Sequence, residues 1–344
     1  MNNRIELHFA PLQGFTVPEY RQAYVDVFGA DAVDCFYTPF LRIHAGKIEA
    51  RGLRDAAQAL KSPFETVPQI IFGSLDEFDT LTAALRDLGA QRIDLNLGCP
   101  FMPQVRRGRG SGTLRQPQLL AEIADRIVAD TGVEYSVKMR LGVEEPDECL
   151  DLVPILNDMP LRHVAIHPRT MRQQYGGEVH REAFERLAAQ LAHPIIYNGD
   201  VRTVEDIAHL TAAYPYLRGV MIGRGLLAEP WLATEWRTGE TMPHADRLAA
   251  LARLHEDYMQ RLAARLCGPQ QLLTCLKPFW EYLEPVIGHR PFRAIAKSRS
   301  FDAYTTAVAS ALNNNSRTEL KSLLMRMLTE MVFYGEKTRV SSYT

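Results

Sequence analysis

The residues best suited to chemistry lie in one run, Ile93–Pro100, where an apolar segment ends in an amide and then a thiol. Asn96 can hydrogen-bond to the polar edge of a ring, and Cys99 can donate a proton. Gly98 and Pro100 flank Cys99 and end regular pairing, so the thiol is expected on a loop rather than inside a helix or sheet. A thiol on an exposed loop favours a chemical role. The alternative is a small buried hydrophobic residue, the common fate of a free cysteine.

Other candidate residues, most of them polar, follow apolar runs at the positions where a strand is expected to end. They are Pro11, Leu12, Gln13, Gln69, Lys138, Arg140, His167, Arg169, Asn198, Gly199, Asp200, Gly223 and Arg224. In a barrel of parallel strands, catalytic groups belong at the carboxyl ends of the strands, so these side chains are expected to gather. Taken singly, His167 also fits a structural histidine and Lys138 an ordinary salt-bridge partner. The agreement of seven strand ends favours a site.

Two of these strand ends have the features of a phosphate site. Gly199 and Gly223–Gly225 leave backbone N–H groups exposed, each is followed by a predicted helix, and Arg224 adds positive charge. Barrels often bind phosphate at strands seven and eight, although turn glycines are the simpler reading. Lys138 could stabilise negative charge on an electron-rich ring, and Gln69 offers a donor and an acceptor to a ring carbonyl and nitrogen. Flavin mononucleotide (FMN) supplies both the ring and the phosphate.

The elements that must position these residues form a repeated strand–helix pattern. The predicted strands are His8–Leu12, Cys35–Leu41, Pro68–Gly73, Arg92–Gly98, Tyr135–Leu141, His163–Pro168, Pro194–Asn198 and Gly219–Gly223. The predicted helices are Pro18–Phe28, Leu75–Leu88, Pro117–Asp130, Asp147–Asn157, Arg181–Leu191, Val204–Ala213 and Leu226–Trp236. Eight repeats predict an α/β fold, a (β/α)8 TIM barrel. The competing doubly wound sheet would need a glycine-rich first turn, and Ala10–Gly14 is not GxGxxG.

The remaining chain is predicted to be helical. The long connection Arg42–Val67 is expected to contain a short helix near Leu53–Leu60. After Gly239–Pro243 the pattern predicts a C-terminal all-helical domain. Its expected segments are Ala245–Leu266, Gln270–Leu283, Phe301–Leu312 and Ser316–Phe333. We therefore expect a catalytic barrel over 1–240, a helical domain over 244–335 and a tail over 336–344.

Composition limits the class of protein. With 344 residues and 46% hydrophobic content, the chain can bury a large core without a metal or disulfide. Its five cysteines are widely spread without CxxC or Cys/His spacing, so we expect no metal site and a reducing, cytoplasmic location. No leader or membrane-spanning stretch is evident, so a soluble protein is expected.

Charge is divided unevenly along the chain. The formal net charge of the whole chain is −2. The segment from His244 onward has 14 Lys and Arg against nine Asp and Glu, a net charge of +5, and the preceding part of the chain has a net charge of −7. A basic C-terminal appendage on an acidic body suggests nucleic-acid binding, although solvated surplus charge is the simpler alternative.

The ordered motifs resemble the tRNA-dihydrouridine synthase family, over nearly the whole chain. They are Ala10–Gly14, Leu95–Pro100, Val137–Gly142, His167–Thr170, Asn198–Asp200 and Met221–Gly225. The departures are Leu12 in place of the usual Met, Val17 where Asp is common, and a varied Ser111–Thr113 segment. They leave the subfamily, and the tRNA position that is modified, open.

The resemblance implies reduction of uridines in tRNA to 5,6-dihydrouridine, with FMN as cofactor and NADPH as a transient reductant. Cys99 would be the general acid, delivering a proton to C5 after hydride reaches C6, because a thiol with a pKa near 8.5 is mostly protonated at neutral pH. Asn96 and His167 would hold flavin and uracil. FMN would be bound by Pro11, Leu12, Gln13, Gln69, Lys138, His167, Asn198, Gly199, Asp200, Gly223 and Arg224. The tRNA side would involve Asn96, Arg140, Arg169, Arg107, Arg109, Arg290, Arg293 and Lys297. We expect a monomer.

Two other functions share part of this pattern. A flavin barrel acting on a free pyrimidine, as dihydroorotate dehydrogenases do, would share cofactor and ring chemistry, but would not require the basic appendage or the arginines after Cys99. A flavin-containing RNA-binding module without turnover would not need Cys99.

Overall fold

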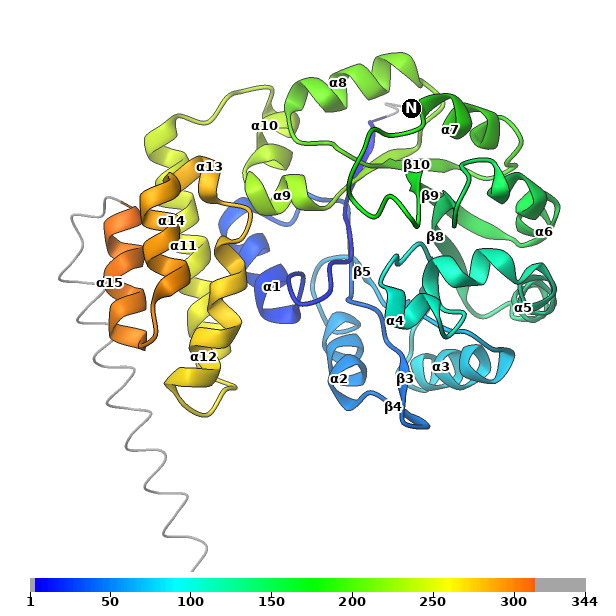
Figure 1. Cartoon of the computed structure of the whole chain (residues 1–344), viewed down its shortest axis with the longest axis horizontal. Coiled ribbons are helices and arrows are strands. Elements are labelled where there is room, and N and C mark those ends of the chain that lie inside the picture. Colours follow the sequence, from blue (N-terminus) through cyan, green and yellow to red (C-terminus); the bar gives the residue numbers. More distant parts are fainter. Residues whose placement is uncertain (1–3, 313–344) are drawn as a thin grey trace, which may run out of the picture. The chain divides into compact units, whose positions relative to one another are not determined.

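The chain divides into two units in this computed structural model, which describes residues 4–312 (Figure 1). The first contains Met1–Leu226 and Pro230–Glu240, and the second contains Leu227–Glu229 and the chain from Thr241. Within the described part of the chain, no helix is both long and apolar enough to cross a membrane.

The first unit is a closed barrel of parallel strands. The strands are β1 Glu6–Phe9, β2 Cys35–Tyr37, β5 Thr66–Val67, β6 Gln69–Ile70, β7 Arg92–Leu97, β8 Glu134–Gly142, β9 Leu161–Thr170, β10 Ile195–Asn198 and β11 Gly219–Ile222. Their order is β5-β2-β1-β11-β10-β9-β8-β7-β6. Only Pro68, which has no N–H, separates β5 from β6, so the two act as one barrel strand that pairs with β2 on one side and β7 on the other. The predicted eight strands and (β/α)8 fold are confirmed.

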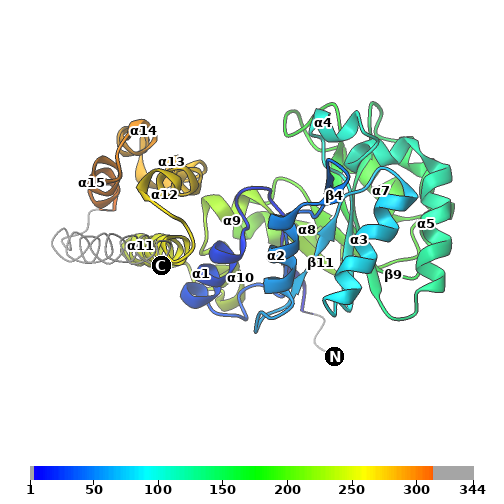
Figure 2. The same cartoon turned by 90° about the horizontal axis from the view of Figure 1, so that it is seen from below.

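Helices surround these strands in both views (Figures 1 and 2). They are α1 Pro18–Phe28, α2 Ala50–Ala59, α3 Leu75–Asp87, α4 Met102–Val105, α5 Pro117–Ala129, α6 Val153–Asp158, α7 Arg181–Ala188, α8 Val204–Ala213, α9 Arg224–Ala228 and α10 Leu232–Thr238. Two 3-10 helices, Gly110–Arg115 and Glu148–Leu152, and a small hairpin of β3 Ile43–His44 with β4 Lys47–Ile48 complete the unit. Two of these helices begin at residues whose side chains cap the first turn. The Ser74 side chain caps α3, and Thr203 forms a capping box with Asp206 at the start of α8.

Two predicted helices are divided in the structure. The expected helix Asp147–Asn157 is a 3-10 turn followed by α6, because Pro154 lacks the N–H that a continuous helix would need. The expected helix Leu226–Trp236 is α9 followed by α10, with Pro230 in the break between them.

Alternating side chains give the barrel an apolar layer and a polar rim. Seven buried residues form one cluster: Ala10, Cys35, Tyr37, Val67, Ala165, Ile196 and Met221. In β8, Val137, Met139 and Leu141 are fully buried, while the alternate positions are Ser136, Lys138 and Arg140. Parallel register sets Asn96 beside Lys138 and Arg140 beside His167, so the polar positions of neighbouring strands are aligned.

The second unit is helical through residue 312. It contains α11 His244–Ala263, α12 Pro269–Leu276, a 3-10 helix Lys277–Trp280, α13 Glu284–Ile287, α14 His289–Lys297 and α15 Phe301–Ala311. Its core includes a buried triad in which Trp280 Nε1 donates to the Tyr304 hydroxyl at 2.8 Å and that hydroxyl bonds to His255 Nε2 at 2.6 Å. Burial lowers the pKa of His255 to about 3, so this imidazole is neutral and accepts the hydroxyl proton.

Differences from prediction in this unit follow prolines and glycines. The expected helix Gln270–Leu283 ends at Leu276, where Pro278 tightens the chain into a 3-10 turn. Helices α13 and α14 were not predicted, because Gly288 and prolines interrupt their short apolar pattern. The predicted helix 316–333, the boundary at 335 and the tail 336–344 lie outside the described residues.

Candidate active site

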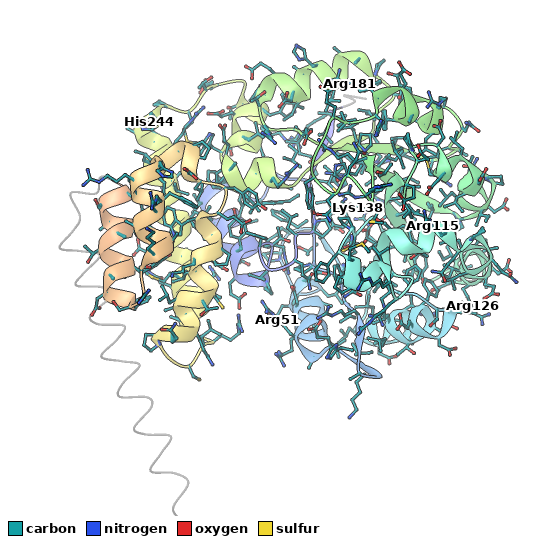
Figure 3. The ribbon with its side chains drawn as sticks, viewed as in Figure 1. Arg51, Arg115, Arg126, Lys138, Arg181 and His244 are labelled. Atoms are coloured by element: carbon teal, nitrogen blue, oxygen red, sulfur yellow. The ribbon has the colours of Figure 1, made fainter. Side chains whose placement is uncertain are left out.

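A cavity opens where the barrel strands end. It contains about 940 Å³ of space between atoms when its open mouth is included. Thirteen of the residues predicted from the sequence line it: Pro11, Leu12, Gln13, Asn96, Cys99, Lys138, Arg140, His167, Asn198, Gly199, Asp200, Gly223 and Arg224. Figure 3 shows Lys138 among the barrel strands, whereas Arg51 and Arg126 lie at the periphery.

Asn96 holds the backbone that carries the thiol. Its side-chain oxygen accepts hydrogen bonds from the N–H groups of Gly98, at 3.1 Å, and Cys99, at 2.8 Å. On the other side, the Ser111 N–H donates to the Cys99 carbonyl at 3.1 Å. Gly110 packs so closely that a Cβ there would lie 2.8 Å from both Cys99 Cβ and its carbonyl oxygen, and its φ is +59°. The Cys99 loop is therefore fixed from two directions.

The Asn96 amide ends a buried chain of hydrogen bonds. Its Nδ2 donates to Gln69 Oε1 at 2.7 Å, and Gln69 Nε2 donates to Asp94 Oδ2 at 2.7 Å. The Ser136 hydroxyl donates to the other Asp94 oxygen at 2.5 Å. We call Asp94–Gln69–Asn96 the amide chain. A carboxylate can only accept and the two backbone N–H groups can only donate, so both ends impose one orientation on the amides between them.

The structure places Gln69, which the resemblance assigns to the flavin, inside this amide chain. It is fully buried, it does not line the cavity, and both ends of its amide are bonded within the amide chain. Sequence reasoning identified Gln69 and Asn96 as polar strand ends but missed Asp94, whose signal was its alternate position two residues before Asn96 in the same strand.

Burial controls the charge of the groups near the thiol. It raises the pKa of Cys99, against smaller opposing effects of the Phe101 backbone N–H, Arg140 and Lys138, so the thiol is protonated at neutral pH. Burial, together with Arg140, lowers the pKa of Lys138 to about 8. Burial also raises the pKa of Asp94 to about 6, despite its hydrogen bonds. Within residues 4–312, the Lys138 ammonium has no hydrogen-bonding partner and remains available to a ligand.

His167 is held neutral among cations. Burial and then Arg140, Lys138 and Arg169 lower its pKa well below the usual value. Arg169 Nη1 lies 3.2 Å from His167 Nε2, and a guanidinium can only donate, so the imidazole proton resides on Nδ1. Arg169 is almost fully buried and forms an ion pair with Asp200, which also binds Arg224 at 3.2 Å. Arg169 therefore organises the cavity wall and is absent from its lining.

Tyr175 is a cavity residue that sequence reasoning missed. Its ring lies under two guanidinium groups, with the central carbons of Arg140 and Arg224 at 5.4 and 4.7 Å from the ring centroid. Arg140 also donates to the carbonyl oxygens of Gly98 and Thr170, both at 2.9 Å. The available signal was an aromatic residue in a glycine-containing segment directly after a predicted strand.

The predicted tRNA-contacting arginines have different surroundings. Arg107 is exposed, whereas Arg109 is buried and binds both carboxylate oxygens of Glu77, so its guanidinium anchors the loop after Cys99. The remaining predicted contacts, Arg290, Arg293 and Lys297, lie on α14 of the second unit.

Known proteins that resemble this chain in sequence share a single family description. The family model "Dihydrouridine synthase (Dus)" matches residues 8–317. The tRNA-dihydrouridine synthase B of Pasteurella multocida is 32% identical over 49% of this chain and 50% of that protein. The tRNA-dihydrouridine(16) synthase of Cupriavidus necator is 30% identical over 76% of this chain and 83% of that protein. Among solved structures, the old yellow enzyme from Trypanosoma cruzi is similar over 69% of this chain and 89% of that one, with 10% identity and a TM-score of 0.48. The family match covers most of the sequence, and the chain belongs to the dihydrouridine synthase family.

Proposed function

We propose that this protein reduces uridines in tRNA to 5,6-dihydrouridine, with FMN as its cofactor and NADPH as its reductant. The observation that carries the proposal is the protonated Cys99 thiol, which opens on the same cavity as the Lys138 ammonium. An acid and a cation on one cavity suit a reaction that places negative charge on a ring and then protonates it.

The cavity residues fit a flavin nucleotide. Lys138 offers a cation without a partner among the described residues, and Gly223 and Arg224 offer backbone and charge for a phosphate. Gly225 must remain glycine for this loop to form, since a Cβ there would lie 2.2 Å from the Val201 carbonyl oxygen. When bound, reduced FMN supplies hydride to C6 of uracil. Pro11, Leu12, Gln13, Asn198, Gly199 and Asp200 complete the proposed cofactor wall.

Cys99 then supplies the proton. The S–H bond breaks as a C–H bond forms at C5, so hydride and proton together add one H2 across the C5–C6 double bond. A carboxylic acid of ordinary pKa would already be ionised at neutral pH, whereas burial keeps this thiol protonated. Asn96 positions the thiol through the Cys99 backbone, and neutral His167 keeps a proton on Nδ1 that it can donate to a ring carbonyl.

A uridine can enter the cavity only after it leaves the tRNA stack, which costs a few kcal/mol. Contacts to neighbouring nucleotides must offset this cost. We propose that Arg107 near the cavity, and Arg290, Arg293 and Lys297 on α14, bind tRNA phosphates.

Sequencing-based dihydrouridine mapping tests this function. A strain lacking the gene should lose dihydrouridine at one or more tRNA positions, and a wild-type copy should restore it. A Cys99→Ala copy should not restore it, although that variant should still bind FMN and tRNA. An unchanged dihydrouridine map in the deletion strain would contradict the proposal. The purified protein should be yellow and release FMN on denaturation, and its reduction by NADPH and NADH can be followed at the flavin absorbance.

A further inference from the structure

The segment after Cys99 exposes two consecutive large apolar side chains. Phe101 is 60% exposed and Met102 is 39% exposed. Single exposed hydrophobic residues are common on protein surfaces. These two are adjacent, however, and follow Pro100, which itself lines the cavity. They therefore extend the cavity rim as an apolar surface.

This surface is mounted on fixed backbone. The Phe101 N–H donates to the Cys99 sulfur, and the Phe101 carbonyl accepts from the Gln104 N–H at 2.8 Å at the start of the short helix α4, Met102–Val105. Within α4, buried Gln104 accepts from the Arg109 backbone N–H at 3.1 Å, and the Arg109 guanidinium is bound by Glu77. An aromatic ring that needs little ordering loses little entropy when a ligand stacks on it.

Positive charge accompanies the apolar residues. Arg106 and Arg107 are exposed, and neither has an ion-pair partner among residues 4–312. Aromatic and apolar side chains beside unpaired cations are the combination that binds unstacked nucleotides, since bases stack on the ring and phosphates contact the cations.

We propose that Phe101 is a stacking platform for the nucleobase next to the reduced uridine, with Met102 as an adjoining apolar contact and Arg106 and Arg107 on the adjoining phosphates. The proposal rests on the proposed function, because it takes tRNA as the ligand. Extrusion of the uridine exposes a face of the neighbouring base, and Phe101 lies two residues from the thiol that the extruded base must reach. Stacking on an aromatic side chain typically changes affinity by about 5- to 150-fold.

Binding of unmodified tRNA transcript tests the platform independently of turnover. Phe101→Ala should weaken tRNA binding by at least about 5-fold, while Phe101→Trp should retain wild-type affinity. Phe101→Leu should resemble Phe101→Ala, because an aliphatic side chain has no stacking face. Tyr216→Ala is the matched control. Tyr216 is 53% exposed but precedes β11, at the end of the barrel opposite the cavity, so its loss should leave affinity unchanged.

Salt dependence separates stacking from charge. Phe101→Ala should lower affinity without changing the slope of log affinity against log salt concentration, whereas Arg106→Ala should reduce the slope by about 0.7 to 1. Equal tRNA affinity for Phe101→Ala and wild type would overturn the platform and leave the apolar pair to another partner, such as a protein. Full activity of Phe101→Leu would overturn the stacking role as well. If Phe101 governs tRNA binding but wild-type protein forms no dihydrouridine, the platform stands and the proposed reaction fails.

Discussion

Asp94→Asn should stabilise this protein at neutral pH. Burial raises the pKa of Asp94 from 3.8 to about 6, so ionisation of this carboxyl is harder in the folded than in the unfolded chain. Because the pKa is higher in the folded state, the neutral carboxyl favours folding. The stability that it contributes is fully present below pH 3.8 and is lost as the pH rises through about 6. The loss corresponds to roughly 3 kcal/mol at pH 7.5. Asn is neutral at every pH and keeps the oxygen that accepts from Gln69, while its amide can donate to the Ser136 hydroxyl, so it should avoid most of this loss.

Urea unfolding of both proteins at several pH values measures the effect. The stabilisation by Asp94→Asn should fall from roughly 3 kcal/mol at pH 7.5 to about 1 kcal/mol at pH 4.5, because Asp94 is then protonated in the folded state while the unfolded chain is still mostly ionised. Asp94→Ala is the contrasting variant. It leaves Gln69 Nε2 without its acceptor, and an unsatisfied buried donor costs about 1–3 kcal/mol. A variant Asp94→Asn that is less stable than wild type at pH 7.5, or a difference that does not vary with pH, would refute the reasoning.

Three other predictions concern separate parts of the barrel. Burial lowers the pKa of His163 to about 2, so the unfolded chain takes up a proton more readily than the folded one. The free energy of unfolding should therefore fall as the pH drops below 6.5, by up to about 1.4 kcal/mol per pH unit. In urea-unfolding experiments, His163→Gln should make this fall smaller. Gly110→Ala should abolish dihydrouridine formation, because its Cβ would displace the Cys99 loop, whereas Gly132→Ala, whose nearest contact is an ordinary 3.6 Å, should leave it intact. Iodoacetamide should alkylate Cys99 more slowly than exposed Cys267 at pH 7.5, and alkylation of Cys99 should become faster as the pH rises. Peptide mass mapping measures both rates. Rapid labelling of Cys99 at pH 7 would contradict a protonated thiol.

The sequence predicted those features that depend on local pattern. Buried strands of a parallel barrel are short apolar runs, and helix boundaries follow prolines and capping residues, so α1 and α8 begin and end where predicted. The candidate site was predictable for a topological reason. Once the eight strands are assigned, their carboxyl ends must meet, and most polar residues at those ends line one cavity.

The partners of those residues were not predictable. Glu77 lies 32 positions from Arg109, and only the closed barrel brings the pair together and makes Arg109 a loop anchor. Arg169 is paired with Asp200, 31 positions away, for the same reason. Residue type and strand position indicate that a side chain reaches the rim, but pairing and burial decide whether it faces a ligand or supports a neighbour.

Asp94 illustrates why a costly group can persist beside an active site. If an amide replaced the carboxylate, it could present either its oxygen or its nitrogen to Gln69, and the reversed orientation would turn Gln69 and then Asn96. The turned Asn96 would set its NH2 group against the N–H groups of Gly98 and Cys99, where no hydrogen bond can form. The Asp94 carboxylate can only accept hydrogen bonds, so from its end of the amide chain it excludes the reversed orientation of Gln69 and Asn96. The ionised Asp94 therefore lowers the stability of the fold but holds the Cys99 loop in one orientation. Asp94→Asn should raise the free energy of unfolding and leave the thiol less firmly positioned.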